Sequence, residues 1–300
     1  YKYATGHSPK KINLLSVNNL DQYNQSNGEF KSKMGYLGDT LSTNGKKIGV
    51  LGNSDYYDLI TGQEIRNRDF ALMVMDSRGR IEEGNVDFIN KKDQSFPFGI
   101  STDYDKLKDE TKKYYAKTDF LMVNLGDTFR LDEYKVNLNS KTYARMKYRV
   151  YNKVSDYLEY VFKMAGKNDT IYILGSFPSK LDYANNRRLA PLVRFDMSES
   201  GKGLLLSATT RRAGVFANLD LGVDILNRFG LKNTEMVGRV LTNKTMDNRD
   251  EYMAREYKKI VAISSIRMTI INIYVAVISV SWILGALALW QRDKLPKKHK

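Results

Sequence analysis

The sequence predicts an α/β fold in which a doubly wound, largely parallel sheet carries helices on both faces and is followed by one C-terminal transmembrane helix. Short apolar runs alternate along the chain with segments of helical periodicity, and several runs are apolar throughout, as in strands buried on both faces. The third observation is an uncharged stretch of 23 residues, Met268–Trp290. At 1.5 Å per residue it reaches roughly 34 Å, enough to cross a hydrocarbon core of ~30 Å.

The elements are expected from residue 35 onward. Residues 1–34 are polar with little periodicity, which indicates a loop-rich segment, expected to be the truncated N-terminal part of the domain. Apolar residues at helical or strand spacing then predict helices over 34–44, 103–116, 142–165 and 224–229, and strands over 48–51, 70–75, 120–125, 170–174, 192–195 and 204–207. Gly45, Gly166 and Gly230 follow helical patterns, where glycine commonly ends a helix.

These elements predict an α/β domain over 35–250, followed by a basic juxtamembrane segment at 251–267, a transmembrane helix at 268–290 and a basic tail at 291–300. The alternative for 268–290 is a buried core helix, which its length and apolarity disfavour. The tail holds the denser group of basic residues, so the positive-inside rule predicts a cytoplasmic tail and an extracytoplasmic main domain.

The net charge of +14 is concentrated near this helix. Residues 255–300 hold nine Lys or Arg residues and two acids, which gives a net +7. A nucleic-acid-binding domain would instead carry its basic residues on the folded part, so no nucleic-acid partner is expected. The basic residues Lys258, Lys259 and Arg267 suit anionic headgroups.

Composition excludes several chemistries. The chain has no cysteine, which rules out disulfides, thiolate zinc sites and cysteine nucleophiles. Its two histidines, His7 and His299, lie near the ends of the sequence, which excludes Ser-His-Asp triads and HExxH zinc sites in between. Any chemistry here depends on carboxylates, hydroxyls, amides, lysine and arginine.

Candidate site residues follow the predicted strands, because ligands bind at the carboxyl ends of strands in doubly wound sheets. Asp55 follows the first strand, Asp127 and Arg130 follow the strand at 120–125, and a polar run follows the strand at 204–207. This run consists of Thr209, Thr210, Arg211 and Arg212. Asp55 and Asp127 suit Mg²⁺, Mn²⁺ or Ca²⁺, while Arg130 and the polar run suit an anion.

We therefore expect Asp127, Arg130, Thr210 and Arg211 to converge at one end of the sheet. Simpler interpretations stay open. Asp127 and Thr128 are typical helix-capping residues, Arg211 and Arg212 are typical of a solvated or salt-bridged surface pair, and 201–203 is typical of a hairpin turn.

Two segments together resemble a known family. Residues 37–55, LGDTLSTNGKKIGVLGNSD, and residues 189–230, which end in DLGVDILNRFG, resemble the alkaline phosphatase superfamily, which includes sulfatases and phosphoglycerate mutase-like enzymes. Residues 124–131 (NLGDTFRL) and 204–220 resemble a membrane-anchored bacterial branch of it. The resemblance covers roughly residues 35–235.

The resemblance implies a hydrolase or phosphotransferase ancestry with two metals held by Asp and His and attack by Ser or Thr. Asp127 matches an acidic residue of the family, but Arg130 stands where a His is expected. Residues 175–178 stand where the family has an Asp-His pair, and residues 209–212 stand where it has a further His. The resemblance implies a nucleophile before or near Tyr1, and Thr5 is a candidate for it. A conventional dinuclear zinc site is not expected on this donor set.

Three functions follow as expectations. The first is a degenerate, membrane-anchored domain that binds a phosphorylated or anionic envelope component without turnover. The second is a metal-dependent phosphoester hydrolase or transferase that uses oxygen ligands. The third is a structural, membrane-tethered interaction module.

Overall fold

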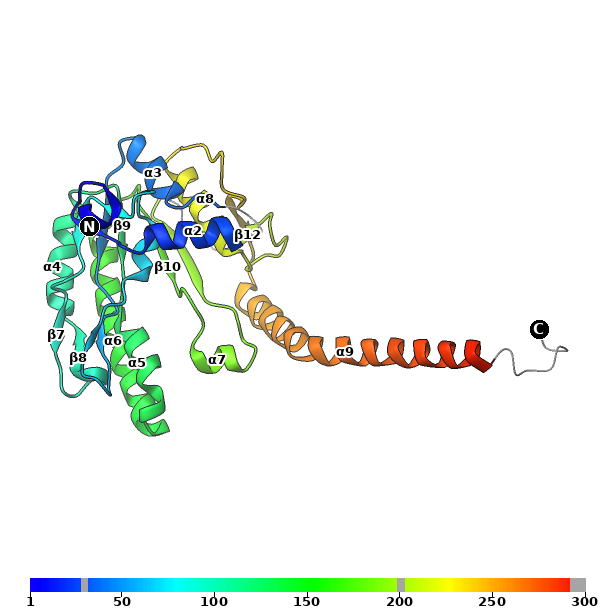
Figure 1. The fold of residues 1–300 in the computed structure, drawn as a ribbon. Coiled ribbons are helices and arrows are strands. Elements are labelled where there is room, and N and C mark those ends of the chain that lie inside the picture. The colour runs from blue at the N-terminus through cyan, green and yellow to red at the C-terminus, as the bar shows by residue number, and fades with distance from the viewer. Residues whose placement is uncertain (28–31, 199–202, 292–300) are drawn as a thin grey trace. The chain divides into compact units, whose positions relative to one another are not determined.

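Figure 1 shows a computed structural model that describes residues 1–27, 32–198 and 203–291. Most of the predicted turn at 201–203 and most of the basic tail at 291–300 lie outside the described residues. The chain forms two compact units: the first comprises Tyr1–Ile171 and Phe195–Thr245, and the second comprises Tyr172–Arg194 and the residues from Met246 onward.

The described helices and strands alternate only in part, because residues 56–102 hold six short strands and no α-helix. The α-helices are α1 (Lys2–Thr5), α2 (Val17–Asn27), α3 (Tyr36–Thr43), α4 (Tyr104–Tyr115), α5 (Asp127–Tyr134), α6 (Ser140–Met164), α7 (Lys180–Ala184), α8 (Asn218–Arg228) and α9 (Arg249–Gln291). Short 3₁₀ helices are η1 (Asp69–Met73), η2 (Pro97–Gly99) and η3 (Lys135–Asn137). The strands are β1 (Ile12–Asn13), β2 (Ile48–Leu51), β3 (Tyr56–Tyr57), β4 (Glu64–Ile65), β5 (Arg80–Ile81), β6 (Glu83–Asn85), β7 (Asn90–Lys92), β8 (Ile100–Thr102), β9 (Phe120–Val123), β10 (Thr170–Leu174), β11 (Leu192–Asp196), β12 (Gly203–Ser207) and β13 (Leu241–Thr245).

A three-stranded parallel sheet lies in the first unit. Its strand order is β6-β2-β9, and β2 runs parallel to both neighbours. All four residues of β2 are buried, as expected for the central strand of a sheet that is covered on both faces. A mixed α/β fold with a parallel sheet is thereby confirmed.

Each face of this sheet has its own hydrophobic core, because successive residues of a strand point to opposite faces. On one face, Val50 packs in a cluster with Leu41 of α3 and Leu226 of α8. On the other face, Leu51 packs with side chains of α4 and α6, among them Tyr157. This packing fixes the positions at which the chain leaves β2 and β9.

The parallel sheet is smaller than predicted. β10 pairs with β11, and β12 pairs antiparallel with β13. The strands predicted at 170–174, 192–195 and 204–207 therefore exist, but among the described residues they pair outside the three-stranded sheet. The expectation that residues 204–207 end at the same sheet edge as β2 and β9 is wrong.

Three further local predictions are corrected. Residues 69–73 form the 3₁₀ helix η1 and not a strand, because a short buried apolar run has no periodicity that separates the two. The first 34 residues contain the 11-residue helix α2, so they are not uniformly loop-rich. Helix α8 begins at Asn218, earlier than the predicted 224, and this places Asp220 in its first turn.

The glycine stops are confirmed at Gly45 and Gly230. Both adopt the left-handed conformation, with φ of 72° and 67°, two residues after the last residue of α3 and of α8. Helix α6 ends differently, because Ala165 turns the chain into an extended conformation with ψ of 133°.

Helix α9 runs over 43 residues and includes the whole uncharged stretch. It is the one helix among the described residues that is long and apolar enough to cross a membrane, and none of its apolar window is buried in the protein. Within the described residues, this stretch is therefore not a buried core helix. The predicted juxtamembrane segment, 251–267, belongs to the same continuous helix.

Candidate functional site

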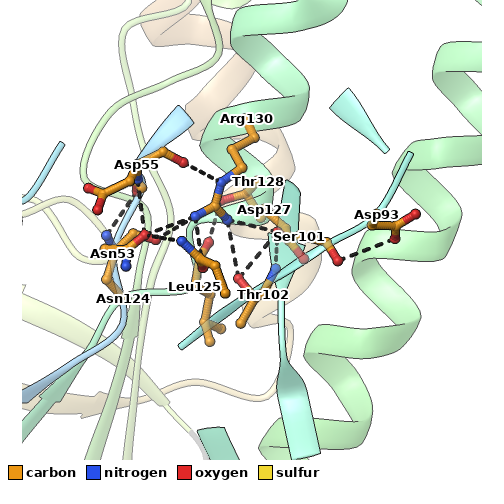
Figure 2. Close-up of polar contacts among 12 residues, drawn as sticks. Asn53, Asp55, Asp93, Ser101, Thr102, Asn124, Leu125, Asp127, Thr128 and Arg130 are labelled. Carbon is orange, nitrogen blue, oxygen red and sulfur yellow. Dashed lines mark hydrogen bonds and ion pairs between the residues drawn. The ribbon is translucent and has the colours of Figure 1, made fainter. Parts of the chain in front are cut away.

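Arg130 lies at the centre of a buried polar network at the ends of β2 and β9 (Figure 2). Its side chain is fully buried, and the guanidinium donates to protein acceptors through all three nitrogens. Nε donates to the carbonyl of Asp55 at 2.7 Å, and Nη1 donates to Asp127 Oδ1 at 2.9 Å and Thr102 Oγ1 at 3.2 Å. Nη2 donates to the carbonyl and side-chain oxygens of Asn53 at 3.1 and 3.0 Å, and to Asn90 Oδ1 at 3.0 Å.

This geometry uses every N–H of the guanidinium, which has five. An anion at Arg130 would therefore have to displace existing bonds of a buried side chain. Arg130 is therefore a structural cation that joins the loop after β2, the β7–β8 hairpin and the first turn of α5.

Asp127 is the counter-ion of Arg130 and is itself buried. Its Oδ1 also accepts hydrogen bonds from the backbone N–H of Thr102 at 2.9 Å and the hydroxyl of Thr102 at 3.2 Å. Asp127 lies in the first turn of α5, where a carboxylate also interacts favourably with the helix dipole. Its neighbour Thr128 is exposed and donates to the carbonyl of Leu125 at 3.1 Å.

The two strand-end loops approach each other backbone to backbone because two glycines permit it. A Cβ on Gly52 would lie 2.2 Å from the carbonyl oxygen of Asn124, and a Cβ on Gly126 would lie 2.0 Å from that of Asn53. Asn124 Nδ2 donates to Ser54 Oγ across the same contact at 2.9 Å. The close approach brings Asp55 and Asp127 to one guanidinium.

Asp55 is held by a second cation, Arg68. Arg68 Nη2 lies 3.0 Å from Asp55 Oδ2, and Arg68 Nη1 lies 2.7 Å from Asp87 Oδ1. The other oxygen of Asp55 accepts the backbone N–H of Asn67 at 2.8 Å. Each candidate metal-ligating carboxylate therefore already has an arginine partner.

Burial and neighbouring charges shift the pKa values of three side chains in this network. Burial lowers the pKa of Arg130, and the Asp127 carboxylate opposes that effect. Burial also disfavours the charge of Arg68, but Asp55 and then Asp87 outweigh it and raise its pKa. Burial first, and the Asp127 charge second, raise the pKa of the Tyr104 phenol, which stays neutral. The ion pairs of this network are Arg130 with Asp127, and Arg68 with Asp55 and Asp87.

The donor set does not fit a resident metal. Within the described residues, no group of three or more His, Asp or Glu side chains could hold a metal ion. Asp55 and Asp127 make their short contacts to different arginines, so their oxygens are not directed at a shared cation.

The polar run after β12 belongs to a different network, which is organised by Asp220. One oxygen of this buried carboxylate accepts the hydroxyl of Thr209 at 2.6 Å and the backbone N–H of Arg239 at 2.9 Å. The other accepts the hydroxyl of Ser207 at 2.6 Å and the backbone N–H of Ala217 at 3.0 Å. Asp220 therefore ties the end of β12, the start of α8 and the chain before β13 together.

Hydrogen bonds within the loop fix its backbone further. Thr210 Oγ1 donates to the carbonyl of Val215 at 2.5 Å and accepts the N–H of Arg212 at 3.3 Å. Arg211 has a φ of 56°, in the left-handed region that a non-glycine residue seldom adopts. Strained conformations of this kind persist where the surroundings hold them, and they are frequent at ligand sites.

Arg211 and Arg212 are exposed. In the part of the chain that the structure describes, neither guanidinium has a hydrogen-bond or ion-pair partner. The alternative of a salt-bridged pair therefore does not apply to the described residues, while a solvated pair is compatible with them. This loop presents two cations on a backbone fixed by Asp220.

The sequence-predicted residues fall into two groups. Asp55, Asp127 and Arg130 share one network, whereas Thr209, Thr210, Arg211 and Arg212 belong to another. Thr5 belongs to neither: it ends α1, and its hydroxyl donates to the carbonyl of Tyr1 at 3.0 Å.

Sequence reasoning missed residues that complete both networks. Asn90 and Thr102 lie on the short β7–β8 hairpin, which has no recognisable apolar pattern. Acidic residues are frequent in the first turn of a helix. A correct prediction of the start of α8 would therefore have pointed to Asp220. Comparison with known proteins gives no further guide, because no family model, curated protein or solved structure matches the chain.

Proposed function

We propose that this chain is a membrane-anchored, extracytoplasmic domain that binds a phosphorylated or otherwise anionic component of the cell envelope without turning it over. The observation that carries the proposal is the loop Thr209–Arg212, in which two exposed arginines, without carboxylate partners among the described residues, stand on a rigid backbone. Arginine suits this role because its planar fork matches the oxygens of phosphate.

The ancestry we propose is a degenerate member of the alkaline phosphatase superfamily with a doubly wound core. It is supported by the two sequence segments that resemble that superfamily and by a parallel sheet whose two faces both pack against helices. The loop with Arg211 and Arg212 occupies the position in the sequence at which the resemblance implies a metal-binding histidine. In the proposal, arginines meet the anion there directly.

The lack of turnover in this proposal rests on the two carboxylates. A hydrolytic mechanism on oxygen ligands would need Asp55 and Asp127 to direct free oxygens at one metal. Each is instead neutralised by its own arginine, at 3.0 and 2.9 Å. The metal-dependent hydrolase is for this reason the less favoured function.

Binding is tested on the full chain in nanodiscs of zwitterionic lipid, so that lipid charge does not compete. Inorganic phosphate and glycerol phosphate are titrated by calorimetry into the wild type and into the Arg211→Gln/Arg212→Gln double variant. We expect saturable binding that weakens at least about tenfold in the variant, as for the loss of charge-assisted hydrogen bonds. The matched control, Arg66→Gln, removes another exposed arginine and should bind as the wild type does. Binding that survives the double variant would contradict the proposal, and absence of any binding would favour the interaction module.

Turnover is tested with a chromogenic phosphate ester, with and without Mn²⁺. We expect none above the rate without protein. Mn²⁺-dependent hydrolysis that is lost in Asp127→Ala would show the hydrolase instead.

A further inference from the structure

The segment that connects β10 and β11 exposes a group of large apolar side chains. Phe177 is 84% exposed, Leu181 54% and Tyr183 55%. These side chains lie on or beside the short helix α7, in the segment between β10 and β11. A hydrogen bond from the Gly175 N–H to the carbonyl of Pro191, at 2.9 Å, joins the two ends of this segment. We call residues 176–190 the hairpin tip.

The hairpin tip is also basic. It carries Lys180, Arg187 and Arg188 against one acid, Asp182. Asp182 already accepts the hydroxyl of Ser179 at 2.7 Å and lies 3.7 Å from the guanidinium of Arg187. The guanidinium of Arg188 lies over the ring of Tyr183, 4.7 Å from its centroid. The tip therefore combines aromatic and aliphatic side chains with a net positive charge.

The hairpin tip and α9 belong to the same compact unit. A domain on a membrane-spanning helix is held near the bilayer, so even a weak lipid contact benefits from a high local concentration. Aromatic rings beside Lys and Arg are the combination that partitions into the headgroup region, where rings reach the acyl boundary and cations meet anionic lipids.

We propose that the hairpin tip is a second membrane contact, in which Phe177 and Leu181 insert into the interface of a bilayer that contains anionic lipid and Arg187 and Arg188 bind its headgroups. The contact would restrict the domain on its anchor. It does not depend on anion binding at Arg211 and Arg212, which lie in the other unit.

The chain offers a clean probe because it has no cysteine. A nitroxide is attached to Phe177→Cys in the full chain, reconstituted into nanodiscs of either zwitterionic lipid or a mixture with anionic phosphatidylglycerol. Power-saturation spectroscopy compares the collision of the label with oxygen, which concentrates in the bilayer, and with a water-soluble nickel chelate. The matched control is Val136→Cys, at a side chain of the first unit that is 90% exposed.

We expect the label at 177 to shift from chelate-accessible to oxygen-accessible in anionic nanodiscs, while the label at 136 stays chelate-accessible. Adding Arg187→Gln and Arg188→Gln should reverse the shift at 177. A label at 177 that stays chelate-accessible in anionic nanodiscs would overturn the proposal. Equal immobilisation of the label at 177 in detergent and in nanodiscs would also overturn the proposal. That result would indicate that a protein partner or a second copy of the chain holds the hairpin tip.

Discussion

Arg130 links three parts of the chain through one guanidinium. Its acceptors are supplied by the loop after β2, the β7–β8 hairpin and the first turn of α5, where Asp127 is only three residues away. A buried ion pair of this kind contributes little compared with a well-packed apolar pair, but removal of one partner leaves an uncompensated charge. Arg130 is therefore expected to matter for folding and not for ligand binding.

Replacement of Arg130 by methionine should lower the free energy of unfolding by about 3–5 kcal/mol, since it leaves the buried Asp127 carboxylate without a cation. The measurement is urea unfolding of the full chain in detergent, followed by near-ultraviolet circular dichroism. The control is Arg66→Met, which removes an exposed guanidinium 3.6 Å from Glu64 and should cost less than ~1 kcal/mol. Equal losses in the two variants would show that the network carries no special stability.

Asp220 should make stability depend on acid pH. Burial alone would raise the pKa of this carboxyl, but hydrogen bonds from Ser207, Thr209 and the backbone of Arg239 and Ala217 outweigh it, and the pKa is lowered. A lowered pKa in the folded state means that the carboxylate stabilises the fold above its unfolded pKa of about 3.9, and that this contribution is lost as the pH falls through the folded pKa.

The test of this dependence compares the wild type with Asp220→Asn. At pH 7 the variant should be less stable by about 1–3 kcal/mol, because donors that pointed at the carboxylate lose acceptors. The difference should narrow as the pH falls below about 4. A difference that stays constant from pH 7 to pH 3 would contradict the assigned role of the charge.

The sequence could predict part of the residue-level picture. The rule that chemistry gathers at strand ends correctly brought Asp55, Asp127 and Arg130 together, since β2 and β9 are parallel neighbours. It could not predict that these side chains satisfy one another, which depends on Asn53, Asn90 and Thr102. It did not predict that β12 pairs with β13, so Thr210 and Arg211 follow a strand of another sheet.

At the scale of elements, two loops after neighbouring strands depend on glycine to approach each other. Gly52 has a φ of 84° and almost no space for a side chain, whereas Gly62, in the turn between β3 and β4, has a φ of 68° and nothing within 4 Å of the position that a Cβ would take. Both glycines have a left-handed backbone, but only at Gly52 would a Cβ meet a neighbouring carbonyl oxygen. Comparison of alanine variants at the two positions therefore separates the cost of backbone strain from the cost of the steric clash.

Gly62→Ala should cost about 1–2 kcal/mol, the strain of a left-handed alanine. Gly52→Ala should cost clearly more, because the added methyl would also lie 2.2 Å from the Asn124 carbonyl oxygen. Chemical unfolding of both variants measures the difference. Similar losses would show that the loops after β2 and β9 can separate without cost.

Element prediction from the sequence was best where the signal was long or flanked by glycine. Helix α6 and the stops at Gly45 and Gly230 are examples. It was poor for short buried runs such as residues 70–75, and for a polar helix such as α2, whose sequence holds few apolar residues to set a period.

For the whole molecule, the uncharged stretch predicted the candidate membrane span directly, and α9 extends it to a helix that begins at Arg249. The 19 residues before Met268 add roughly 28 Å of helix at 1.5 Å per residue. The pairing of the remaining strands could not be predicted, because it is decided by contacts between segments far apart in the sequence.

The proposed orientation can be tested with single cysteines in a chain that has none. Asp250→Cys should react with a membrane-impermeant maleimide in intact cells, and Gln291→Cys should react only after the cells are lysed, as the positive-inside rule predicts. The opposite pattern would place the main domain in the cytoplasm and remove the proposed contact with the envelope.

The central claim is that Arg211 and Arg212 meet an anion while Arg130 holds the fold. The most direct measurement is nuclear magnetic resonance of the full chain with ¹⁵N-labelled arginine, in which the Nε–Hε signals are followed as inorganic phosphate is added. We expect saturable shifts for Arg211 and Arg212, with an unchanged and slowly exchanging signal for Arg130. A shift of the Arg130 signal, or unmoved signals of Arg211 and Arg212, would contradict the claim.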